Sequence, residues 1–171
     1  MRNPFALTAT CMLFVLTACA GPESTSPSAL QVSSLTAANS ASSETPPFND
    51  EIILRGDGFG HVKFRQLNDA DRTVYLDTWV RDLAPNTAYK LQRAVDANVD
   101  DNCTSTSWLT LGKGTTPQTI TTDERGTGTE SLFRNLSAFA PGSTFDIHFR
   151  VINAATSAVV LTSDCYQFVV R

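Results

Sequence analysis

Residues 74–81 read V-Y-L-D-T-W-V-R. Apolar and polar side chains alternate along this stretch, which is typical of a half-buried strand, because successive side chains of a strand point to opposite faces. Other runs of the same period are rich in Thr, Val, Phe and Ile, residue types that suit a pleated surface. These runs cover residues 62–66, 89–95, 107–111, 119–121, 127–133, 145–152, 158–162 and 166–170.

Turn-forming clusters separate the alternating runs, for example Gly56-Asp57-Gly58 and Ala140-Pro141-Gly142. No window keeps a period of 3.6 residues long enough to predict a core helix. Residues 121–127, T-T-D-E-R-G-T, predict a hairpin with an acidic turn. Short strands at this spacing predict an all-β domain of about seven to nine strands, a sandwich or a barrel.

One turn carries a family resemblance. Leu83, Pro85, Thr87 and Tyr89 form an L-x-P-x-T-x-Y pattern, and residues 140–147 repeat part of it as A-P-G-S-T-F-D-I. This pattern resembles the corner of fibronectin type III and other immunoglobulin-like sandwiches. The resemblance implies a single antiparallel immunoglobulin-like β-sandwich, in which the Tyr89 hydroxyl bonds to nearby backbone.

The N-terminal stretch is similar to a bacterial lipoprotein signal. Arg2 precedes an apolar run that closes on Leu16-Thr17-Ala18-Cys19 and is too short for a stable membrane span. In the lipoproteins that it resembles, Cys19 becomes the first mature residue and carries the acyl chains. Asp, the inner-membrane retention residue of that family, is absent after Cys19, which favours the outer membrane in a cell with two membranes. The alternative is an ordinary secretory signal in which Cys19 stands by chance.

Three regions follow from these patterns. Residues 1–18 are predicted to be a signal peptide, and 19–47 a lipidated cysteine with a disordered tether rich in Ser, Thr, Ala and Pro. Residues 48–171 are predicted to form the β-domain.

Four cysteines divide among these regions. Cys11 leaves with the signal, Cys19 is the anchor, and Cys103 and Cys165 remain for the domain. Export places that pair in an oxidising compartment, so we expect a structural disulfide. Two free thiols or a redox pair are the alternatives, although the C-x-x-C spacing is missing.

A cation site is the first candidate for chemistry. Oxygen-bearing side chains at Asp96, Asn98, Asp100 and Asp101 match the first half of a calcium loop. The match then fails, because glycine and the bidentate glutamate are missing. Calcium is therefore the one cofactor that the sequence suggests, and a polar loop tied down at Cys103 is the alternative.

Aromatic stacking is the second candidate. Trp79 and Trp108, if exposed, offer platforms for a sugar ring or a protein partner; if buried, they belong to the core. On the strand over residues 145–152, His148 shares the polar face with Asp146 and Arg150, which predicts a solvated face or a histidine paired with a carboxylate.

Other classes of function find little support. The net charge is −4 with no basic block, so nucleic acid is not expected as a partner. No G-x-S-x-G elbow and no histidine pair are present, so we predict no enzyme, with an envelope hydrolase as the least favoured alternative. The sequence predicts a lipid-anchored, non-catalytic binding or structural module of the bacterial envelope, with an envelope protein or a glycan as its partner. A calcium- or carbohydrate-dependent binding domain is the alternative.

Overall fold

The computed structural model describes residues 48–171, which form twelve strands and no helix. The all-β prediction is confirmed. The strands are β1 (Phe48–Gly56), β2 (Phe59–Gln66), β3 (Val74–Arg81), β4 (Ala88–Asp96), β5 (Leu109–Thr110), β6 (Gly112–Lys113), β7 (Thr116–Pro117), β8 (Ile120–Thr121), β9 (Gly128–Arg134), β10 (Thr144–Asn153), β11 (Val159–Ser163) and β12 (Tyr166–Val169).

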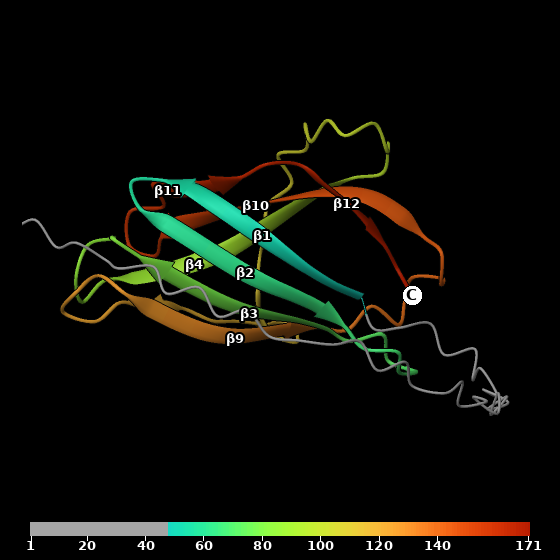
Figure 1. Cartoon of the computed structure of the whole chain (residues 1–171), viewed down its shortest axis with the longest axis horizontal. Coiled ribbons are helices and arrows are strands. Elements are labelled where there is room, and N and C mark those ends of the chain that lie inside the picture. Colours follow the sequence, from blue (N-terminus) through green and yellow to red (C-terminus); the bar gives the residue numbers. More distant parts are fainter. Residues whose placement is uncertain (1–47) are drawn as a thin grey trace, which may run out of the picture. The chain divides into compact units, whose positions relative to one another are not determined.

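These strands belong to one mixed sheet that curls into a nearly closed, barrel-like form (Figure 1). Its order is β5-β4-β10-β11-β1-β2-β3-β9-β6-β7, with β12 paired to β10 and β8 paired to β4. The described pairs are antiparallel except for β6 and β9, which run parallel. A tight turn connects β8 to β9, so the two ends of the sheet approach each other at β8.

This arrangement corrects two finer expectations. There are twelve strands, more than the expected seven to nine. The alternating runs left out β6 and β7, which have only two residues each, and β1, where the consecutive apolar residues Ile52, Ile53 and Leu54 break the alternation. The strand order also differs from two separate antiparallel sheets. Strand β11 pairs with β10 on one side and β1 on the other, so it joins what would be the two layers of a sandwich.

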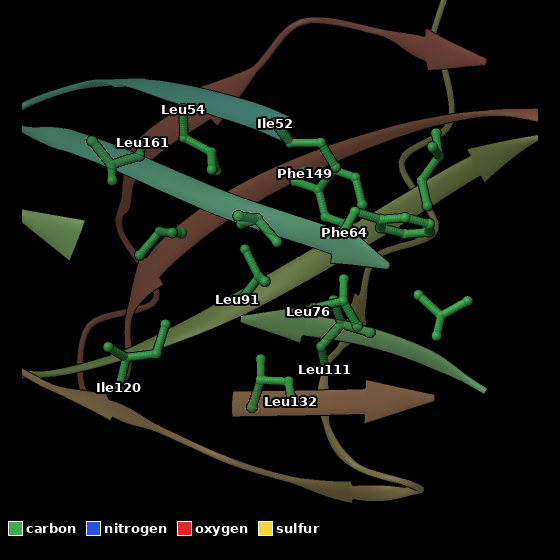
Figure 2. Close-up of a cluster of buried hydrophobic side chains, with 14 of the residues drawn as sticks. Ile52, Leu54, Phe64, Leu76, Leu91, Leu111, Ile120, Leu132, Phe149 and Leu161 are labelled. Atoms are coloured by element: carbon green, nitrogen blue, oxygen red, sulfur yellow. The ribbon is translucent and has the colours of Figure 1, made fainter. Parts of the chain in front are cut away.

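The core lies inside the barrel-like sheet and consists of the inward side chains that the alternation predicts (Figure 2). On β3, for example, Val74, Leu76 and Val80 are buried. Phe64 packs edge-on against Phe149 and Phe168, with ring centroids 6.5 and 4.9 Å apart, a favoured aromatic geometry. Strands from opposite walls of the barrel-like sheet thus meet through these rings.

The loop of residues 97–108, between β4 and β5, covers the outer face of β10. A disulfide joins Cys103 to Cys165 with a Cα–Cα distance of 5.4 Å, which confirms the predicted pairing. The Asp146 carboxylate accepts two successive backbone N–H groups of the loop at 2.9 and 2.8 Å. His148 bonds to a loop carbonyl at 3.1 Å. The prediction of a solvated face was therefore wrong for Asp146, which is fully buried because the loop lies over it.

One turn matches its prediction and a second matches it in part. The buried Tyr89 hydroxyl accepts the backbone N–H of Ala84 at 3.1 Å, which is the hydrogen bond expected of the corner. The acidic turn over residues 121–127 is present, but β8 pairs with β4 and β9 pairs with β3 and β6, so the predicted hairpin is not formed. Asp123 lies in the turn before β9, and its Oδ1 accepts the backbone N–H groups of Arg125 and Thr127 at 2.8 and 2.9 Å. These local bonds preset the backbone direction between strands.

Candidate functional site

A cavity of about 240 Å³ lies at one end of the barrel-like sheet. At this end β2, β4 and β9 finish, while β3 and β10 begin. Its inner wall includes Phe64, Leu76, Leu111 and Phe149, which Figure 2 shows grouped in the core. The rim includes exposed residues, among them Phe139 with 44 % of its surface accessible, so the cavity opens to solvent.

Arg93 projects into this cavity from β4. It shares the inward side of the strand with Leu91, which is fully buried, and Val95, which packs against the core. Its guanidinium makes no hydrogen bond or ion pair with any residue between 48 and 171. A charged group in apolar surroundings is costly unless something compensates it, so its presence here is unusual for a structural side chain.

Arg134 reaches the same cavity from the end of β9. One of its terminal nitrogens donates to the Gly114 carbonyl at 3.1 Å. Burial lowers the pKa of Arg93, and the positive charge of Arg134 lowers it further. No aspartate or glutamate is among the described residues that line the cavity. Two like charges therefore share a largely apolar pocket that no acidic side chain of the described residues lines.

Such an arrangement of charge can hold an anion. Besides the arginines, the polar residues of the lining are Ser143 and Thr144, and the Thr144 hydroxyl donates to the Gly142 carbonyl at 3.2 Å. No described side chain in the cavity combines a nucleophile with a general base, which is what a hydrolytic site needs. The geometry is that of a binding pocket with a few placed polar groups.

This site was not predicted from the sequence, although a pattern pointed to it. Arg93 falls in the apolar positions of the alternation over residues 89–95, between Leu91 and Val95. Arg134 has the same relation to Leu132 and Leu136. Arginine on the core side of a strand is rare without a partner, so two such positions are the sequence pattern to look for.

The structure places the predicted calcium residues in the 97–108 loop and the end of β4. Asp96 accepts hydrogen bonds from Thr104 and from the backbone of Ser105 at 3.0 to 3.2 Å. The Asn98 amide donates to Asp100 at 2.6 Å. These oxygens hold the loop together. Among residues 48–171, no three His, Cys, Asp or Glu side chains, Asp101 included, converge as a metal site requires.

Trp79 lies on β3 and Trp108 at the end of the 97–108 loop, and the two do not form one platform. Trp108 stacks its ring on the Arg150 guanidinium, 4.0 Å away, and lies 4.6 Å from the His148 ring. Trp79 points outward from β3 and lines a second hollow, of about 370 Å³, together with Glu130. Both tryptophans are half-buried, so neither is a core residue, and Trp79 keeps access to solvent.

Cys19 and the rest of the predicted signal and tether lie outside the described residues. Within the described part, no helix is long and apolar enough to cross a bilayer. Comparison of the chain with protein-family models, with curated proteins and with solved structures finds no match.

Proposed function

We propose that this protein is a lipid-anchored, non-catalytic binding module of the bacterial envelope, and that the Arg93 cavity is its binding site. One observation carries the proposal: Arg93, which has no hydrogen-bond or ion-pair partner among residues 48–171, points into an apolar cavity that opens to solvent. An unpartnered charge in this position does not stabilise the folded state, whereas a ligand that reaches it can form a favourable interaction with it.

The anchor comes from the Cys19 pattern. Two or three acyl chains would hold the protein on a membrane, because each buried methylene contributes about 0.8 kcal/mol. A tether over residues 20–47 of flexible composition would span roughly 30 Å on average. Phe48, where the domain begins, pairs with Gln66 at the same end of the barrel-like sheet as the cavity. The proposed tether therefore joins the domain at its open end, within reach of the bilayer surface.

The anchor and the site are tested separately. For the anchor, Cys19→Ser should move the protein from the membrane fraction to the soluble fraction, and unchanged partitioning would contradict lipidation. For the site, 1-octanol is a neutral probe of suitable size, and its binding can be followed by calorimetry and by the melting temperature of the Cys19→Ser protein.

A matched pair of tryptophan substitutions locates that binding. Ala97→Trp fills the rim of the cavity, and we expect it to weaken octanol binding at least tenfold. Ala155→Trp adds the same side chain in the exposed turn between β10 and β11 and should leave binding unchanged. Equal effects of the two substitutions, or no octanol binding by the unsubstituted protein, would contradict the proposed site.

Carbohydrate binding at Trp79 is the second candidate, favoured by the hollow that this ring shares with Asp77 and Glu130. An aromatic face beside polar oxygens is a suitable surface for a sugar ring. Quenching of tryptophan fluorescence by soluble glycans, abolished in Trp79→Ala, would support it. The immunoglobulin-like relationship also stays a proposal, supported by the Tyr89 corner and not by the strand order.

A further inference from the structure

We infer that the Arg93 cavity selects a small amphiphilic carboxylate, whose carboxylate lies between Arg93 and Arg134 and whose apolar body lies against Phe64 and Phe149. This inference rests on the proposed function and names the class of ligand for the same site.

Charge comes first. Arg93 has no hydrogen-bond or ion-pair partner among the described residues, and Arg134 is close enough to act on it electrostatically. An anion between them would satisfy one guanidinium and remove the repulsion between the two. A neutral ligand would leave both charges as they are, and a cation would add a third positive charge. The pocket is therefore complementary to a negative head group.

The geometry of the donors favours a carboxylate. Arginine presents a planar fork that matches the two oxygens of a carboxylate, and such paired bonds are shorter and stronger than neutral ones. Arg134 already gives one nitrogen to the Gly114 carbonyl, and the rest of the lining is largely apolar, so the third oxygen and the second charge of a phosphate would face apolar surroundings. A single carboxylate uses the Arg93 fork fully and the remaining Arg134 donors in part.

Size and polarity describe the rest of the ligand. At about 30 Å³ for each heavy atom, the share of a water molecule in the liquid, the 240 Å³ cavity holds about eight heavy atoms. The inner wall is aromatic and aliphatic, so these atoms are carbon. The acyl chains of the proposed anchor are esters or an amide and carry no anion, so the arginine pair does not select them.

Octanoate, 1-octanol and octylammonium test the inference, because they share a chain and differ in head-group charge. With the Cys19→Ser protein, which lacks acyl chains that would compete, we expect octanoate to bind at least tenfold more tightly than octanol. Octylammonium should bind more weakly than octanol. In a series of alkanoates, affinity should rise about fourfold with each methylene until the cavity is full, near eight carbons, and then level off.

Substitutions identify the residues. Arg93→Gln should reduce octanoate affinity to that of octanol while octanol affinity stays within about twofold, and Arg134→Gln should have a smaller effect in the same direction. Arg81→Gln removes the same charge from an exposed position on β3 and should change neither affinity. Melting curves of all three proteins establish that each is folded.

The outcomes separate this inference from the proposed function. Equal affinity for octanoate and octanol would overturn the selection of an anion and leave the binding site standing. Tighter binding of octyl phosphate than of octanoate would overturn the carboxylate assignment. A steady rise in affinity through dodecanoate would overturn the assignment of size. If neither octanol nor octanoate binds, the inference and the proposed function fall together.

Discussion

Replacing Arg93 by methionine should make the folded protein more stable. The guanidinium is half-buried in an apolar cavity, has no partner among residues 48–171 and lies near the positive charge of Arg134. Methionine has a similar length, no charge and a side chain that adapts to irregular space. The substitution removes a charge that folding does not compensate.

The magnitude follows from the environment of each arginine. An unpartnered buried polar group costs about 1–3 kcal/mol, and partial exposure of Arg93 places it at the low end. We therefore expect Arg93→Met to raise the free energy of unfolding by about 1 kcal/mol. In a domain of this size the melting temperature should rise by about 3–5 °C.

Arg150→Met is the matched control, since it makes the same change on the neighbouring strand but on its outer face. Arg150 donates from Nε to the Gln92 side chain at 2.8 Å and stacks on Trp108 at 4.0 Å. Losing one hydrogen bond and one cation–π contact should cost about 1–3 kcal/mol. The two substitutions are therefore expected to change stability in opposite directions.

Urea unfolding of the two variants, monitored by circular dichroism in the Cys19→Ser background, measures both changes under the same conditions. If Arg93→Met destabilises the protein as much as Arg150→Met does, Arg93 serves the fold. The argument that it is held for a ligand would then be refuted.

Three further predictions concern the elements that support the domain. Asp123→Asn should flatten the dependence of stability on pH below about 5, because hydrogen bonds from the backbone of Thr127 and Arg125 lower the pKa of Asp123. The contribution of Asp123 to stability is complete above its unfolded pKa of about 3.9 and is lost as the pH falls through its folded pKa. An unchanged slope in acid unfolding would contradict this prediction. Asp146→Ala removes the acceptor for two backbone N–H groups and should cost about 2–3 kcal/mol in urea unfolding, more than Asp146→Asn, which keeps an acceptor oxygen. Replacing Cys165 by serine opens a bridge with a sequence separation of 62 residues and should cost about 4 kcal/mol, and a loss below about 1 kcal/mol would show that the 97–108 loop is held without the disulfide.

Sequence alone determined the features that depend on near neighbours. The alternation over residues 74–81 shows which side chains point inward, because the side-chain direction of a strand repeats every two residues. The pattern around Tyr89 predicted a hydrogen bond across five residues, and it is present. The disulfide followed by elimination, because Cys11 and Cys19 fall in the predicted signal and anchor, which leaves Cys103 and Cys165 to pair if the domain is exported as predicted.

Tertiary structure alone decided the features that depend on contacts distant in the chain. A strand does not carry in its own residues the identity of its neighbours, so the bridging position of β11 was beyond the local pattern. Asp146 stands on the polar side of its strand, yet the loop tied by Cys103 makes that side interior. For Arg93, the alternation of the sequence predicts that the side chain points inward. Whether it has a partner depends on the residues that folding brings around it. Burial and charge compensation depend on all the residues that the folded sheet brings around a side chain, so the candidate site could be recognised only in the structure.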